Sequence, residues 1–188
     1  TGAAEPAGAS PGGFQLSFAI VRHNGADSSW QTPADWEGGV RPMGPNAVVF
    51  DKYASYEVAF STAAKALAAN ITAGDVTWQL GGHALSAAGA VRVGDPITQP
   101  AAALQVNDGT VAAAAGLFVY PNATFSGAAT IQGDVTVEAG GSLTAMQITG
   151  NHVTIDGAAD VGTLGNGVTT VVTVGTTGQL TTSRIRAK

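Results

Sequence analysis

Four stretches of nine residues in the second half of this chain can be aligned, and each repeats the same order of residue types. They begin at Leu117, Val135, Val153 and Val172, at a nearly constant interval of about 18 residues. Each unit has the order apolar-x-apolar, then a Gly-rich turn, then another apolar residue. A repeat of about 20 residues is typical of a solenoid, because no single unit can bury its apolar face without neighbours stacked against it.

The repeat also predicts which side chains point inward. Residues i and i+2 of a strand face the same way, so the apolar residues of each triplet should stack in successive coils. The residues between them, Thr136, Thr154 and Thr173, should form an outward ladder. The predicted solenoid core comprises Val119, Val137, Ile155 and Val174 from the first strand of each unit, with Leu143, Val161 and Leu180 from the strand after the turn.

The coils before Leu117 follow the same pattern at a shorter spacing. The triplets Val91–Val93 and Leu104–Val106 start about 13 residues apart, and Leu117 follows after an equal interval. Ala63–Ala69 is open to two interpretations, because alanine is the best helix former and is also small enough to fit inside a coil. Strand-like flanks favour a strand and a corner. We therefore predict solenoid coils of about 13–19 residues over residues 61–188.

An extended arm precedes these coils. Residues 1–13 are mostly Gly, Ala and Pro, a composition that does not fold by itself, so any order must be imposed by a partner. A neighbouring subunit is the expected partner. The residues expected to make this assembly contact are Thr1, Pro6, Pro11 and Phe14.

Residues 14–60 are predicted to cap the N-terminal end of the solenoid. They hold short strand-like runs around a polar stretch with two tryptophans. A cap is needed because the ends of a solenoid expose unpaired strand edges that invite aggregation. Trp30, Trp36 and Phe50 form the predicted cap core, and the charged segment Ser183–Lys188 is expected to guard the other end.

Composition favours strands and excludes several functions. Charged residues make up 11% of the chain and hydrophobic residues 45%, which argues against ordinary disorder. The net charge is −5 and no basic run is longer than Arg184–Lys188, which argues against direct binding of nucleic acid. Without cysteine there is neither a disulfide framework nor a thiolate metal site. No apolar run is long enough to span a membrane.

The segment from Ser29 to Phe50 resembles the opening of a known family. Ser29-Trp30, Asp35-Trp36-Glu37-Gly38-Gly39-Val40, Pro42 and Pro45-Asn46-Ala47-Val48-Val49-Phe50 are similar to the start of autotransporter-associated β-solenoid modules. That family usually has Asn before the second Trp, where this chain has Asp35. Such modules occur in bacterial surface and secreted proteins and in some phage structural proteins. The resemblance implies a right-handed parallel β-solenoid without catalytic residues.

The histidines and the later aspartates show no pattern of metal ligands. His23, His83 and His152 are widely spaced, so we expect them in exposed turns. Aspartates recur near the predicted corners, at positions 134, 156 and 160. Stacked carboxylates can bind Ca²⁺, but turn formation is the preferred interpretation. We predict no metal site and no cofactor.

Four acidic residues lie close in sequence to the two tryptophans. They are Asp27, Asp35, Glu37 and Asp51. Carboxylate pairs beside aromatic rings would suit a sugar-cleaving site. The preferred interpretation is that both tryptophans pack in the cap core while the acids decorate a loop. We therefore predict no catalytic residue.

Together these patterns predict an all-β protein, a short right-handed parallel β-solenoid with an N-terminal arm and a Trp-containing cap. The expected function is that of a non-enzymatic structural protein on a virion surface, such as a capsid decoration (cement) protein of a bacteriophage. It would form a homotrimer and bind the major capsid protein or another shell protein. The alternatives are a bacterial cell-surface or secreted adhesin-like module and a carbohydrate-active β-helix.

Overall fold

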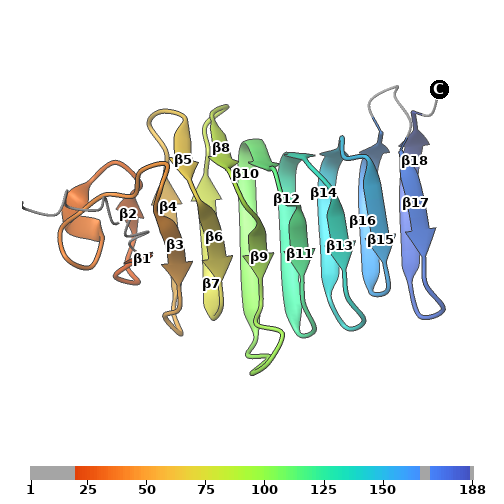
Figure 1. The fold of residues 1–188 in the computed structure, drawn as a ribbon, viewed down its shortest axis with the longest axis horizontal. Helices are drawn as coiled ribbons and strands as arrows, with labels where there is room; N and C mark the ends of the chain where they lie inside the picture. The colour runs from red at the N-terminus through yellow and green to blue at the C-terminus, as the bar shows by residue number, and fades with distance from the viewer. Residues whose placement is uncertain (1–19, 166–169, 187–188) are drawn as a thin grey trace, which may run out of the picture.

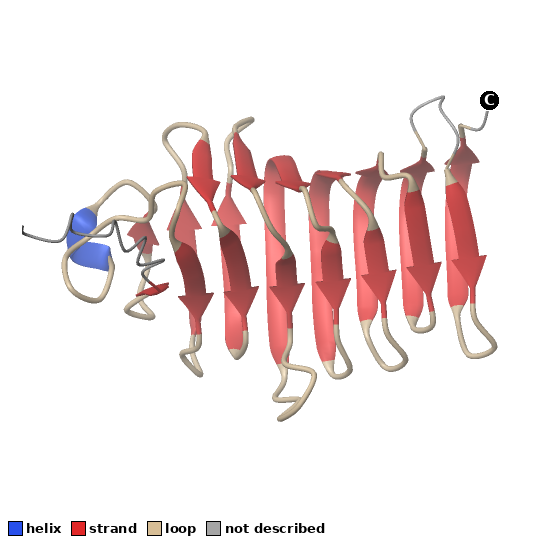
Figure 2. Cartoon of the chain, viewed as in Figure 1, coloured by secondary structure: helices blue, strands red, loops and turns tan. Residues whose placement is uncertain are grey.

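The computed structural model describes residues 20–165 and 170–186, which are nearly all β-strand and turn (Figures 1 and 2). The helical part of this region is one 3-10 turn, η1 (Pro33–Asp35). The predicted arm lies outside the described residues, as does the first part of the cap segment. The expected assembly contacts Thr1, Pro6, Pro11 and Phe14 all lie outside the described residues.

The strands form two sheets in which neighbouring strands are parallel. The eight-stranded sheet has the order β1 (Ile20–Arg22), β3 (Ala47–Phe50), β6 (Ala68–Ile71), β9 (Val91–Val93), β11 (Leu117–Val119), β13 (Val135–Val137), β15 (His152–Ile155) and β17 (Val171–Val174). The ten-stranded sheet has the order β2 (Ser28–Ser29), β4 (Ser55–Ala59), β7 (Gly74–Gln79), β10 (Ala102–Ala113), β12 (Ala123–Gln132), β14 (Ser142–Ile148), β16 (Ala158–Leu164) and β18 (Gln179–Ile185). Within it, β8 (Ala84–Ala87) pairs with β10, and β5 (Ala64–Ala66) pairs with β8.

The chain alternates between the two sheets and advances by one strand at each return. After β11 it runs through β12 in the opposite sheet and comes back as β13, which pairs with β11. We call one such passage through both sheets a circuit. The colours of Figure 1 follow the long axis in sequence order, so each circuit contacts only its neighbours along that axis. Side chains that face inward from both sheets form one continuous core along this axis.

The later circuits have the register that the repeat predicts. Leu117 pairs with Val135, Val135 with Val153, and Val153 with Val172. Two residues along, Val119, Val137 and Ile155 form one inward column, and each is 0% exposed. Stacked β-branched and aliphatic side chains therefore supply the core of this sheet.

The earlier circuits are longer than predicted. Val91 pairs with Leu117 and not with Leu104, which lies in β10 of the opposite sheet. The interval from Val91 to Leu104 therefore measures half a circuit. Both sheets share the apolar-x-apolar pattern, so the pattern does not distinguish a strand beside its neighbour from a strand opposite it.

Val161 is buried but belongs to a different column from the one predicted. Leu143 pairs with Ala159 and Ala159 with Leu180, whereas Val161 pairs with Ala145. The corner between β15 and β16 has two residues, against four between β13 and β14. The shorter corner brings the second strand into register two residues earlier, so an alanine occupies the leucine column.

Two glycines let successive corners stack closely. Gly140 has a φ of 85°, in the left-handed region that glycine adopts without steric cost. Gly157 packs so tightly that a Cβ atom on it would lie 2.3 Å from the carbonyl oxygen of Gly141. A side chain at Gly157 would therefore push two circuits apart.

The alanine-rich segment forms strands, as the strand-and-corner interpretation predicted. It supplies β5 and the start of β6, and Leu67 links the two. Ala64, Ala66 and Ala69 are buried. Small side chains suit this segment because the chain turns here from one sheet to the other. The prediction of a strand and corner is confirmed.

The last circuit is covered on one side only. Val174 pairs with Ile155 but is 46% exposed, and Leu180 is half-buried against the core. Among the described residues, no strand pairs with the outer edge of β17 or β18. The predicted burial of Val174 is wrong because a core side chain needs a neighbouring circuit on both sides.

Matched substitutions in one column test the difference in burial between Ile155 and Val174. We expect Ile155→Asp to lower the free energy of unfolding by about 3 kcal/mol or more, because it buries an unpaired carboxylate. Val174→Asp should cost less than about 1 kcal/mol, because water reaches that position. Urea unfolding of both variants measures the two values. Equal destabilisation would contradict the one-sided covering of the last circuit.

Candidate functional site

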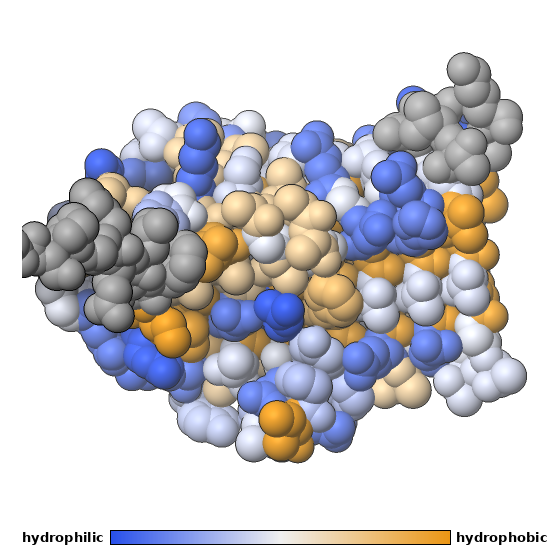
Figure 3. Space-filling model, in the orientation of Figure 1, coloured by the Kyte–Doolittle hydropathy of each residue, from blue (hydrophilic) through white to orange (hydrophobic). Residues whose placement is uncertain are grey.

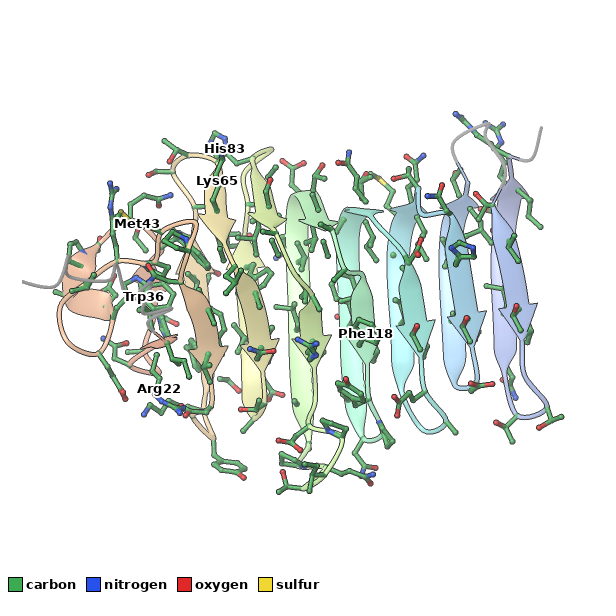
Figure 4. All side chains as sticks on the ribbon, viewed as in Figure 1. Arg22, Trp36, Met43, Lys65, His83 and Phe118 are labelled. Carbon is green, nitrogen blue, oxygen red and sulfur yellow. The ribbon has the colours of Figure 1, made fainter. Side chains whose placement is uncertain are left out.

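The core of the N-terminal cap consists of aromatic rings that are closed to solvent. Trp30 is 3% exposed, Trp36 2% and Phe50 0%. The two tryptophans meet edge to face with ring centroids 5.2 Å apart, a favourable aromatic geometry. The indole N–H of Trp36, labelled in Figure 4, donates to the carbonyl oxygen of Trp30 at 3.2 Å. Neither ring therefore offers an open face to a sugar.

The prediction that His23 lies in an exposed turn is wrong, because His23 lies inside this aromatic cluster. It is 0% exposed, and its ring stacks on Tyr56 with centroids 4.8 Å apart. The ring also meets the edge of Trp36 at 5.0 Å. The available signal was the alternation of Val21 and His23, which places both residues on the inward side of one extended segment.

The hydrogen bonds of His23 define its tautomer. The backbone N–H of Gly25 donates to Nδ1 at 3.1 Å, so the ring proton lies on Nε2. Nε2 then donates to the hydroxyl oxygen of Ser28 at 2.7 Å. Burial lowers the pKa of His23 to about 4, against an opposing effect of the Asp35 carboxylate. Serine and histidine also form nucleophile–base pairs in enzymes, but here the histidine is the donor to the serine.

Two of the cap acids bind backbone N–H groups. Asp35 Oδ2 accepts from the N–H of Ser29 at 2.8 Å. Asp27 Oδ1 accepts from the N–H of Glu57, also at 2.8 Å. Charge-assisted hydrogen bonds of this kind hold loops in place. These carboxylates fix the path of the chain around β2 and β4.

Glu37 and Asp51, the other two of the four acids near the tryptophans, belong to an ion-pair cluster at the surface. Lys52 Nζ lies 2.7 Å from Glu37 Oε1 and 3.7 Å from Asp51 Oδ1. Arg22 also pairs with Asp51. The hydrogen bond from Lys52 lowers the pKa of Glu37. All four acids that the sequence grouped near the tryptophans therefore have partners within the cap.

Asp134 orders a corner of the later circuits. Its Oδ1 accepts from the backbone N–H groups of Asn151, at 3.0 Å, and His152, at 2.9 Å. These hydrogen bonds lower the pKa of Asp134, and the one from the His152 backbone N–H contributes most. Asp134, Asp156 and Asp160 do not form a metal site. In residues 20–165 and 170–186, no group of three or more His, Asp or Glu could hold a metal ion.

The outward column of the eight-stranded sheet carries little charge, and none after Arg92. From the cap to the last circuit, paired positions hold Arg22, Val49, Asn70, Arg92, Phe118, Thr136, Thr154 and Thr173. The guanidinium of Arg92 lies over the ring of Phe118, 5.7 Å from its centroid. Figure 4 labels Phe118 on this face, and Figure 3 shows a row of pale side chains over β13, β15 and β17.

The repeat identified only part of this outward column. It placed Thr136, Thr154 and Thr173 correctly on the outer face. Arg92 and Phe118 were missed, although each is the central residue of an apolar-x-apolar triplet. The same alternation argument could have placed them on the outer face.

The C-terminal end of the stack presents apolar side chains. Val171 is 50% exposed, Val174 46% and Ile185 63%. They belong to β17 and β18, the outermost strands of the two sheets. Arg184 and Arg186 of the predicted charged guard are exposed, yet they leave these apolar side chains uncovered.

Comparisons with known proteins assign the chain to no family. No family model matches it, and no curated protein or solved structure is significantly similar. In the part of the chain that the structure describes, no helix is long and apolar enough to cross a membrane. The functional argument therefore depends on the surfaces of the protein itself.

Acid is expected to weaken the cap through His23. Its pKa is about 4 in the folded protein against 6.5 ordinarily, so between these values mainly the unfolded chain gains the proton. Stability should therefore fall as pH decreases through this range, by about 1 kcal/mol at about pH 5.5. Urea unfolding at about pH 7 and about pH 5.5 measures the change.

The matched control is His23→Gln, which keeps a hydrogen-bond donor but has no titrating ring. Its stability should depend less on pH over the same range, even if it is lower throughout. The same pH dependence in both proteins would show that another group is responsible.

Proposed function

We propose that this chain is a right-handed parallel β-solenoid and a non-enzymatic structural protein, namely a decoration (cement) protein on the surface of a bacteriophage virion. Two parallel sheets whose strands alternate along the chain support the architecture. In Figure 2, front strands point down and rear strands up while the chain advances from left to right, which supports right-handed winding. Crossovers between parallel strands have this hand in nearly all proteins.

The observation that carries the structural role is the nearly uncharged outward column of the eight-stranded sheet. Moving a charge out of water is costly unless it is paired, so a face of hydroxyl, amide and aromatic side chains suits close contact with another subunit. Of its two cations, Arg22 already pairs with Asp51 and Arg92 stacks on Phe118. Arginine and aromatic residues are enriched where binding energy concentrates in interfaces.

The proposed assembly is a homotrimer whose subunits lie side by side along this column. Side-by-side packing uses the length of the rod, so that each circuit adds to the interface. The major capsid protein or another shell protein is the proposed partner of the trimer. Residues 1–13 and the remaining outer faces are the surfaces proposed to meet their neighbours in the virion.

A second candidate is a bacterial cell-surface or secreted module of the adhesin type. The uncovered last circuit favours it, because further circuits stacked on β17 and β18 would bury Val174 and Ile185. The likeness of Ser29–Phe50 to autotransporter-associated modules points the same way. The buried tryptophans of the cap give the third possibility, a carbohydrate-active β-helix, little support.

A charge placed on the outward column tests the trimer. We expect the wild-type chain to sediment with about three times its mass of 18.6 kDa. Thr154→Lys should weaken assembly at least about tenfold, because it brings three like charges into the interface. Sedimentation across a concentration series measures the change.

Thr144→Lys is the matched control, because Thr144 is an exposed residue of β14 on the outer face of the opposite sheet. It should leave the mass unchanged. A wild-type chain that stays monomeric at every concentration, or equal effects of the two lysines, would contradict the proposed interface.

A further inference from the structure

Among the described residues, no strand lies beside β5 on the side away from β8. β1 pairs with β3, and β2 pairs with β4. β5 follows β3 and β4 in the same circuit. It pairs with β8 on one side and with no described strand on the other. An open strand edge is a ready site for an extended chain, which gains backbone hydrogen bonds by pairing with it.

Hydrogen bonds on either side of β5 show which backbone groups face this open edge. The carbonyl oxygen of Ala66 accepts from the N–H of Ala88, on the side of β8. The N–H of Leu67 donates to Asn46 at 2.7 Å, on the opposite side. Backbone groups of successive strand residues alternate in direction. The N–H and C=O of Lys65 therefore point away from β8, toward the open edge.

The open edge lies in a groove with a cation on each wall. The groove has a volume of about 230 Å³ and runs between the segments Arg41–Gly44 and Thr62–Lys65. Arg41 and Lys65 are both exposed, and neither forms an ion pair with a described residue. Figure 4 labels Met43 from one wall and Lys65 from the other. Two cations without an ion-pair partner among the described residues make this groove attractive to an anion, although the whole chain is acidic.

The walls of the groove are held in place by hydrogen bonds. Gln31, which also lines the groove, donates from Nε2 to the carbonyl oxygen of Thr62 at 3.2 Å. On the other wall, the N–H of Met43 donates to the side chain of Asn46 at 2.8 Å. A preformed groove loses little freedom when a ligand enters it, which favours binding.

These features define the chemistry of the ligand. A carboxylate can lie between Arg41 and Lys65 with charge-assisted hydrogen bonds to both. An extended backbone beside it can pair with Lys65. The 230 Å³ volume favours small side chains, and Trp30, only 3% exposed, offers no ring face for a sugar. The groove therefore suits an acidic, extended peptide with small residues.

We propose that this groove binds the arm, residues 1–13, of a neighbouring copy of the chain, with Glu5 between Arg41 and Lys65. The proposal rests on the self-assembly proposed above. Glu5 is the only charged side chain of the arm, and Ala and Gly make up most of the residues around it. Pro6 restricts the preceding residue to an extended conformation, which a strand edge requires.

Engineered cysteines test this contact directly, because the natural chain has none. The Ala4→Cys and Ala63→Cys variants place thiols beside Glu5 and in the groove while all three charged residues remain. Mixed in full-length form under mild oxidation, they should give a disulfide-linked heterodimer, identified by intact mass. Ala4→Cys mixed with Thr144→Cys is the matched control and should give little product.

Charge reversal tests the role of Glu5. Adding Glu5→Lys to the Ala4→Cys chain should reduce the yield of heterodimer about threefold to tenfold, because it opposes two cations. Adding Lys65→Glu to the partner chain should restore part of the loss. A yield that does not respond to either charge would overturn the assigned role of Glu5.

Two further outcomes would overturn the proposal. One is a double variant, Ala4→Cys with Ala63→Cys, that links only within one chain. The other is a heterodimer yield no higher than that of the control. Sedimentation of the unmodified chain separates this failure from failure of the proposed function. A trimer that gives no disulfide-linked heterodimer would retain the proposed self-assembly and exclude binding of the arm in the groove. A monomer that gives no heterodimer would exclude both proposals.

Discussion

Parallel stacking of successive circuits is the constraint on which the rest of this structure depends. A side chain such as Ile155 is buried because circuits lie on both sides of it, and its column partner Val174 is exposed because one of them is missing. Burial is thus a property of position in the stack more than of residue type. The first and last described circuits therefore differ from the middle.

At the N-terminal end the aromatic packing is combined with hydrogen-bonded polar groups, although the buried Tyr56 hydroxyl has no hydrogen-bond partner in the described structure. His23 is buried as a neutral ring because Gly25 and Ser28 satisfy both of its nitrogens. The nearby acids bind backbone N–H groups or basic side chains and so hold the loops of the cap. The acids and tryptophans that are close in sequence, as in a sugar-cleaving site, therefore have structural roles in the cap. Among the described residues, β5 pairs only with β8, and the cationic groove lies along its other side.

Short-range periodicity predicted the middle of this molecule well and its ends poorly. The columns through Val137 and Thr136 follow from alternation, because both neighbours of each circuit repeat the same pattern. The spacing of about 13 residues between the earlier triplets did not give the length of a circuit, because strands of both sheets share one pattern. The column of Val161 depended on the length of one corner, and the burial of His23 on contacts with distant aromatic rings. The threonines of the proposed interface were predictable, whereas the groove arises from an unpaired edge that no local pattern encodes.

The exact register between Val135 and Val153 has a consequence for how such a rod can change its size. One circuit is a repeated module, since it pairs in the same register with the circuit before it and with the circuit after it. Duplication or loss of one repeat in this region would lengthen or shorten the rod by one strand spacing, about 4.8 Å, with the cap untouched. The repeat thus makes the reach of the protein adjustable in fixed steps, independently of the surfaces at its two ends.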